Sequence, residues 1–165
     1  MRRLLKFLHT LGAIALMGGM ACLLLLLAAL PEPAQLSNYA TLRGAMAAIA
    51  TWIVLPGLAL TLVAGLLAMA ATRSFQNAGW ALVKLATGLA VFEGGFAGLV
   101  GPLQEEAERS AAALAGTDAA AQAALAQTQQ AEAGTLWVLM AITVLNVALG
   151  VWRPRLAWRI WRAEQ

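Results

Sequence analysis

Four long apolar segments constrain this chain more than any other feature. They run from about 4 to 30, 41 to 72, 81 to 103 and 136 to 152. Each reaches or approaches the roughly 20 residues that a helix needs to cross about 30 Å of hydrocarbon, and a helix satisfies its own backbone hydrogen bonds in lipid. The chain is 61% hydrophobic and 12% charged, whereas soluble domains are roughly half apolar and a quarter charged. The sequence therefore predicts an all-α membrane protein, a four-transmembrane-helix bundle forming one integral membrane domain.

The segment 104–134, between the third and fourth apolar runs, predicts an outer helical extension between helices 3 and 4. It is rich in alanine and glutamine, which favour helix. Gly116 interrupts it, and Thr117 or Asp118 can then cap a new helix. A disordered low-complexity loop is the alternative. We expect helices at about 4–30, 41–72, 81–103 with a continuation to about 115, and 118–152.

The placement of charge predicts the orientation. Of the 11 lysines and arginines, all except Arg43 and Arg109 fall on one side of the predicted helices, and most acids fall in the two connections on the other side. Since basic residues stay in the cytoplasm, we expect a multi-pass protein of the bacterial inner membrane with both termini cytoplasmic. The tail 153–165, which interleaves arginine with tryptophan, predicts an interfacial helix. The lipid bilayer is the expected partner, and the sequence pI of about 9.8 needs no nucleic acid to explain it.

A carboxylate in the third apolar run, Glu93 of the stretch FEGGF, predicts a polar centre at mid-depth. Ionising it in hydrocarbon would cost several kcal/mol. Depth counting at about 1.5 Å per residue places the least lipid-like residues of all four helices near one level. This structural polar midplane consists of Glu93, Asn146, Pro56, Gly18, Gly19, Gly94 and Gly95. Three interpretations stay open: a packing hydrogen bond from a protonated Glu93, a catalytic proton-handling or ligand-binding role in the bundle core, and a lipid-facing position.

A second level, near the cytoplasmic side, holds His9 and Lys84. Small residues follow His9 at helical spacing, so we expect its ring to point into the bundle. The Lys84 side chain either extends to the lipid headgroups or points into the bundle beside His9. Lys84 and Glu93 are nine residues apart, which puts them on opposite faces of one helix at about 100° per residue. The single histidine excludes a His-rich metal cluster, and the single cysteine excludes an internal disulfide.

Two stretches carry a resemblance to known families. LLKFLHTLGAIALMGGM resembles the opening helix of a superfamily of small bacterial membrane proteins, in which a Lys-x-x-His step leads into a small-residue face, and GWALVKLATGLAV resembles the start of their third helix. The superfamily includes the J-type protoporphyrinogen IX oxidases, the copper-resistance protein D family and an uncharacterised family of predicted four-helix integral membrane proteins. The chain looks most like the last, and FEGG followed by Gly101-Pro102 fits it.

In the J-type oxidases the matching histidine is an axial ligand of haem b and the matching lysine is needed for activity. The resemblance thus implies His9 as a haem ligand and gives Lys84 a cofactor-binding or catalytic role. This chain departs from those oxidases in having one histidine. A haem would therefore need His9 from two protomers, a His–Met pair using Met17, Met20 or Met69, or a five-coordinate iron.

Two functions follow as hypotheses. The first is a small inner-membrane protein that binds b-type haem or handles a tetrapyrrole, with His9 as the metal ligand and Glu93 relaying a proton. The alternative is a non-catalytic accessory protein, or a homo-oligomer, without a cofactor. The sequence does not decide whether the protein is an enzyme.

Overall fold

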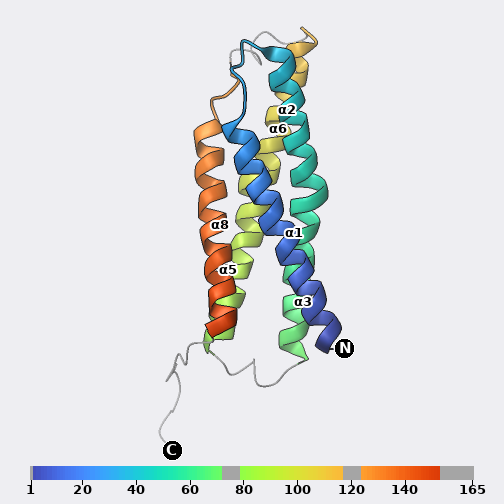
Figure 1. Cartoon of the computed structure of the whole chain (residues 1–165), viewed down its shortest axis with the longest axis vertical. Helices are drawn as coiled ribbons and strands as arrows, with labels where there is room; N and C mark the ends of the chain where they lie inside the picture. Colours follow the sequence, from blue (N-terminus) through green and yellow to red (C-terminus); the bar gives the residue numbers. More distant parts are fainter. Residues whose placement is uncertain (1, 72–78, 117–123, 153–165) are drawn as a thin grey trace, which may run out of the picture.

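The described part of the chain is mostly helical, contains no strand, and forms four long spans. A computed structural model describes residues 2–71, 79–116 and 124–152. All four spans are long and apolar enough to cross a membrane. The first span is α1 (Arg2–Ala28) and the fourth is α8 (Gln129–Trp152). The expected four-helix bundle is confirmed (Figure 1).

The second and third spans each contain a π-helical turn. The second joins α2 (Leu36–Ile49), η1 (Ala50–Val54) and α3 (Leu55–Ala70). The third joins α5 (Gly79–Gly95), η2 (Phe96–Val100) and α6 (Gly101–Leu114).

Each π turn lies directly before a helix whose second residue is a proline, Pro56 or Pro102. A proline inside a helix lacks the N–H group and clashes with the carbonyl four residues earlier. In the wider turn, the Leu55 N–H bonds the Ala50 carbonyl and the Gly101 N–H bonds the Phe96 carbonyl. The two spans therefore continue past their prolines, and η1 contacts η2 in the middle of the bundle.

The two ends of the bundle differ. One end, called here the terminal end, holds the start of α1 and the end of α8; the other, the hairpin end, holds residues 29–35 and the connection from α6 to α8 (Figure 1). The predicted continuation of the third helix is confirmed, because α6 runs to Leu114 and the chain turns at Gly116 with a φ of 68°. The fourth helix begins at Gln129 and not at 118, since 124–128 form turns. Residues 117–123 and the tail 153–165 lie outside the described residues.

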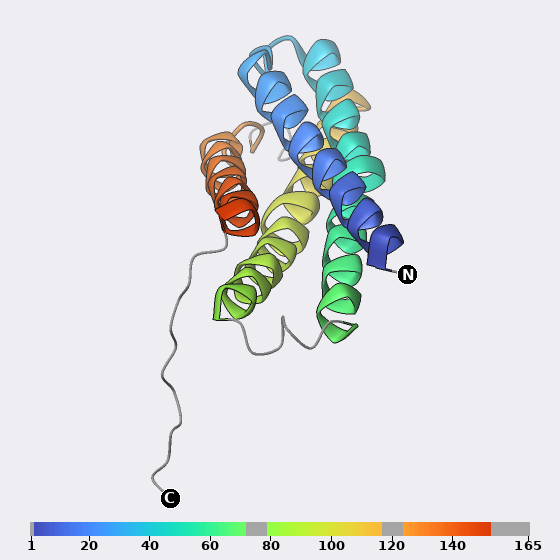
Figure 2. The same ribbon diagram turned by 60° about the horizontal axis from the view of Figure 1, so that its bottom comes forward.

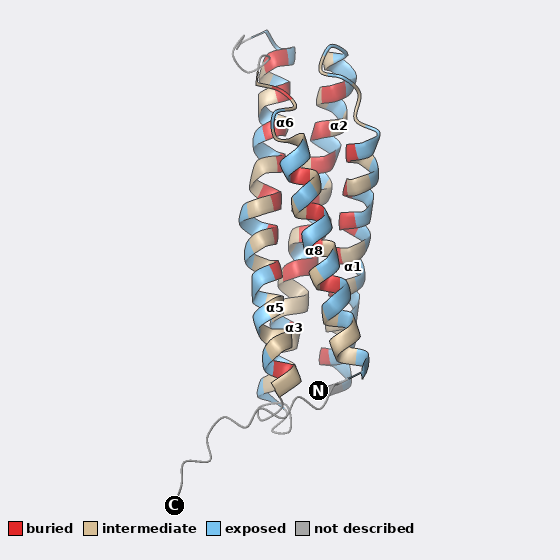
Figure 3. Cartoon of the chain, turned by 90° about the vertical axis from the view of Figure 1, so that its left-hand side faces the viewer, coloured by how far each residue is buried: buried red, intermediate tan, exposed pale blue. Residues whose placement is uncertain are grey.

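Packing pairs α1 with α3, α5 with α8, and α2 with α6. The closest approach joins α1 to α3, where a Cβ built on Gly12 would lie 2.9 Å from the Gly57 carbonyl oxygen and 2.8 Å from the Thr61 nitrogen. Only glycine allows the two backbones to meet at that distance. Buried leucine, methionine and valine side chains fill the centre, and the outward faces of the helices are exposed (Figure 3).

Candidate functional site

A cavity of about 510 Å³ lies in the terminal half of the bundle, between α1, α3, α5 and α8. Of these helices, α3 and α5 draw apart toward the terminal end (Figure 2). Leucine, alanine and valine side chains form most of the wall, and the polar side chains that line it are Lys6, His9, Thr61, Lys84, Thr143 and Asn146. A mostly apolar cavity of this size with a few convergent polar groups has the character of a small-molecule site.

His9 is held in one ring orientation. Its Nδ1 lies 2.8 Å from the backbone carbonyl oxygen of Thr61. A carbonyl oxygen only accepts, so Nδ1 carries the proton and donates it, and the lone pair of the neutral ring is on Nε2. The ring also packs on α3, where a Cβ built on Gly65 would lie 3.3 Å from Nδ1. His9 points into the bundle, as the small-residue stripe predicts, and its ring has the tautomer that histidine ligands adopt.

Lys84 enters the cavity from α5. A Cβ built on Gly150 of α8 would lie 2.7 Å from Lys84 Nζ, so the absence of a side chain at Gly150 makes room for the ammonium group. Lys6, one turn before His9, is exposed and lines the same cavity. Lys6 and Lys84 thus both line the part of the cavity nearest the terminal end.

Asn146 lies on the α8 wall of the cavity, at the level of Thr87 of α5. Its Nδ2 donates to Thr87 Oγ1 at 2.8 Å, and Thr87 in turn donates to the Val83 carbonyl at 2.8 Å. Thr87 precedes Glu93 by six residues, or about 9 Å of helix. Asn146 is therefore closer to the terminal end than depth counting predicts. The count was wrong because it started at Leu136, whereas α8 begins at Gln129.

Of the three interpretations of Glu93, the structure agrees with the lipid-facing position and not with a position in the bundle core. Glu93 is exposed on the outer surface of α5, while Val91 and Gly95 face the interior. The helical-wheel prediction that Lys84 and Glu93 occupy opposite faces is confirmed, with Lys84 on the inside. Depth can be counted along a sequence, but the rotation of a helix about its axis depends on its neighbours. A proton relay from Glu93 into the cavity is not compatible with this arrangement.

The predicted midplane is a level of glycine packing and not of polar contacts. A Cβ on Gly19 would lie 2.7 Å from Val54 Cγ2, one on Gly94 3.1 Å from Leu139 Cδ2, and one on Gly95 2.5 Å from Leu58 Cδ1. Gly18 and Pro56 are exposed and contribute nothing to this level. The glycines therefore bring helices together, whereas Glu93 faces outward at this level and Asn146 lies nearer the terminal end.

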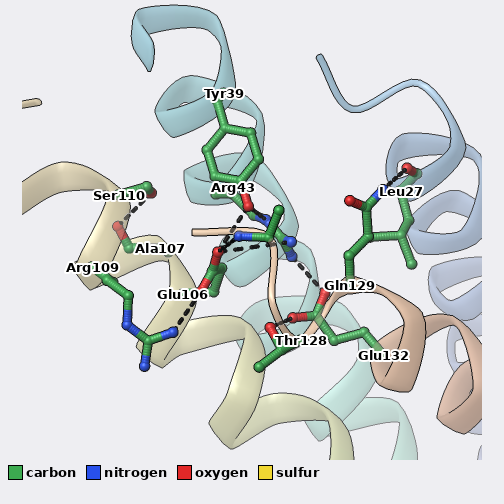
Figure 4. Close-up of polar contacts among 11 residues, drawn as sticks. Leu27, Tyr39, Arg43, Glu106, Ala107, Arg109, Ser110, Thr128, Gln129 and Glu132 are labelled. Atoms are coloured by element: carbon green, nitrogen blue, oxygen red, sulfur yellow. Dashed lines mark hydrogen bonds and ion pairs between the residues drawn. The ribbon is translucent and has the colours of Figure 1, made fainter. Parts of the chain in front are cut away.

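A buried ionic network at the hairpin end was not predicted (Figure 4). Arg43 of α2 donates through Nη1 to Glu132 Oε2 at the start of α8, and through Nε to Tyr39 Oη at 3.1 Å. Tyr39 donates to Glu106 Oε1 at 2.7 Å, and Arg109 donates to Glu106 Oε2 at 2.7 Å. The side chains of Arg43, Glu106 and Glu132 are at most 2% exposed. Two cations and two carboxylates thus balance one another inside the bundle.

The network also fixes the turn that precedes α8. The Ala126 N–H donates to Glu106 Oε1 at 3.0 Å, and Thr128 Oγ1 donates to Glu132 Oε1 at 2.6 Å. Ala126 has a φ of 64°, a left-handed conformation that costs an alanine about 1 to 2 kcal/mol. One sequence signal was available, because Glu106 lies on the stripe formed by Leu103, Ser110 and Ala113, all of which are buried.

The described residues contain no group of three or more His, Cys, Asp or Glu placed to hold a metal ion. A ligand in the cavity would instead meet one imidazole, two ammonium groups and apolar walls. Such a site can bind an amphiphilic anion, and its histidine can coordinate a metal carried by that ligand. No protein-family model, curated protein or solved structure matches the chain.

Proposed function

We propose that this is a multi-pass protein of the bacterial inner membrane that binds a tetrapyrrole, b-type haem in the first place, in the cavity of its terminal half. The observation that carries the proposal is the fixed His9 ring, whose Nδ1 donates to the Thr61 carbonyl and whose Nε2 keeps its lone pair. The predicted positive-inside orientation puts the terminal end, and with it both lysines, at the cytoplasmic face.

The donor set fits a haem. His9 lines the cavity and Met69 of α3 lines it too, so a His–Met pair or a five-coordinate iron is available within one chain. Met20 is fully buried in the core, and neither it nor Met17 lines the cavity. Haem would supply one-electron chemistry, and the lysines would hold its carboxylates. Gly88 lines the cavity with no atom within 4 Å of a Cβ built on it, which leaves room for a large ligand.

The test is haem retention. Protein purified in mild detergent from cells with ample haem is expected to show a Soret band, and His9→Ala is expected to lose it. Gly88→Leu fills the cavity and is expected to reduce the haem content, whereas Gly18→Leu is the matched control, since Gly18 is exposed with open space beside it. Wild-type protein without a Soret band would contradict the proposal.

A non-catalytic accessory protein without a cofactor is the second candidate. It is favoured by the hairpin-end network, in which Arg43 bonds Glu132, Tyr39 links Arg43 to Glu106, and Glu106 holds the turn at Ala126. Mass spectrometry of small molecules that co-purify with the protein separates the two candidates. A tetrapyrrole supports the first, and the absence of any small molecule that depends on His9 supports the second.

A further inference from the structure

Exposed apolar side chains of the four spans form a belt around the bundle, and Glu93 lies near the middle of this belt. Trp52 is exposed near the hairpin-end edge of this belt. Gln104 lies at the same depth as Trp52, because Gln104 Nε2 donates to Oγ1 of the adjacent Thr51 at 2.9 Å. Glu93 precedes Gln104 by 11 residues, about 16 Å, and follows Trp80 by 13 residues, about 20 Å. The carboxyl group is thus far from both polar edges.

The surroundings of Glu93 on the outer surface are apolar. Leu89 and Phe96, one turn to either side, are 55% and 56% exposed. No described residue forms a hydrogen bond or an ion pair with Glu93. A carboxylate at the bilayer centre costs about 2.5 to 3.5 kcal/mol even on insertion scales, and such groups pair with one another or with other polar groups. The isolated bundle therefore leaves a polar group uncovered.

The face that carries Glu93 allows another helix to approach closely. Ala86, Ala90 and Ala97 are exposed at positions −7, −3 and +4 relative to Glu93, which places them on the same side of the helix. Small residues at this spacing permit close helix contact in lipid, and an interhelical hydrogen bond adds to it. Glu93 and the three alanines are called the Glu93 face below.

The chemistry of the Glu93 face favours a second copy of the same chain. A protonated carboxyl both donates and accepts, so two of them satisfy each other. A two-fold axis along the bundle brings each residue against its own counterpart at the same depth. Among the described residues, the exposed basic side chains Arg3 and Lys6 lie at the terminal end, so an ion pair between two copies at this depth has no cation available.

We propose that the Glu93 face is the interface of a parallel homodimer, in which the two Glu93 carboxyl groups hydrogen-bond across the two-fold axis. This dimer does not need a ligand in the cavity, because Glu93 does not line it. It gives the midplane carboxyl a structural role between chains that the bundle alone does not provide.

Disulfide cross-linking in native membranes tests the interface while keeping the carboxyl group. The background carries Cys22→Ala, because Cys22 is exposed. Ala90→Cys is expected to give a cross-linked dimer on oxidation. Val63→Cys is the control, since Val63 is 53% exposed on α3, 11 residues after Trp52, and so lies at the depth of Glu93. Equal cross-linking at the two positions, or a cross-link to a different protein, would overturn the proposal.

The dissociation constant of the dimer, measured by energy transfer between labelled copies in bilayers, tests the carboxyl pair. Glu93→Leu is expected to weaken the dimer about tenfold, the size of one interhelical hydrogen bond. Glu93→Gln keeps a donor and an acceptor and is expected to stay within about threefold of wild type. Circular dichroism checks that each variant is folded. A Glu93→Leu dimer as tight as wild type, or a Glu93→Gln dimer as weak as Glu93→Leu, would overturn the pairing.

Discussion

Arg43 holds a charge inside the hairpin end, and replacing it tests whether the ionic network is needed for stability. Arg43→Met keeps most of the side-chain volume but leaves Glu132, 2% exposed, with Thr128 as its remaining side-chain donor. Removing one partner of a buried ion pair costs about 3 to 5 kcal/mol, because the other charge stays buried and uncompensated. We expect the free energy of unfolding to fall by that amount.

The double variant Arg43→Met/Glu132→Leu separates charge from packing. Replacing both members of a buried pair with apolar residues is often neutral or stabilising. Glu106 keeps Arg109, Tyr39 and the Ala126 N–H as donors. The double variant is therefore expected to be more stable than Arg43→Met alone by about 2 kcal/mol or more. Adding the single variant Glu132→Leu completes a double-mutant cycle, which gives the coupling energy of the pair.

Equilibrium unfolding in mixed micelles, followed by tryptophan fluorescence, gives the four free energies of this cycle. Arg109→Gln is the comparison, since the Arg109 side chain is 31% exposed and its loss leaves Glu106 with Tyr39 and the Ala126 N–H as donors, so it is expected to cost less than Arg43→Met. If Arg43→Met unfolds within about 1 kcal/mol of wild type, or if the double variant is less stable than the single one, the account of the network is refuted.

Three further predictions concern packing and backbone. Gly12→Val is expected to lower the free energy of unfolding in mixed micelles by about 1 to 3 kcal/mol, because the valine side chain would meet the α3 backbone. Gly44→Ala is the control and is expected to change this free energy little, because Gly44 has open space beside it. Gly116→Ala is expected to destabilise the hairpin end by about 1 kcal/mol, since Gly116 has a φ of 68°; faster hydrogen exchange in α6 checks this. Asn146→Ala removes the bond to Thr87 and is expected to cost about 0.6 kcal/mol, and a thermal melt showing a loss above about 2 kcal/mol would contradict this.

Features that depend on local sequence could be predicted. The four spans follow from the length and composition of the apolar runs, and the turn at Gly116 follows from a residue that tolerates a positive φ. The orientation of His9 into the bundle follows from the small residues beside it. The start of α8 was predicted too early because alanine and glutamine favour helix, yet 124–128 form turns that bond to Glu106 and are not helical.

The sequence by itself determined the four apolar spans and roughly how far each one extends, because hydrocarbon thickness and backbone hydrogen bonding act on each span separately. Only the tertiary structure decided which face of α5 points inward and where α8 begins. Within the third span, α5 is apolar nearly all round, and lipid is as apolar as a leucine side chain, so no hydrophobic force sets the rotation of α5. The rotation is set instead by packing contacts such as that of Gly95 with Leu58. These contacts place Lys84 inside and Glu93 outside, and contacts between distant segments likewise bring Arg43 to Glu132.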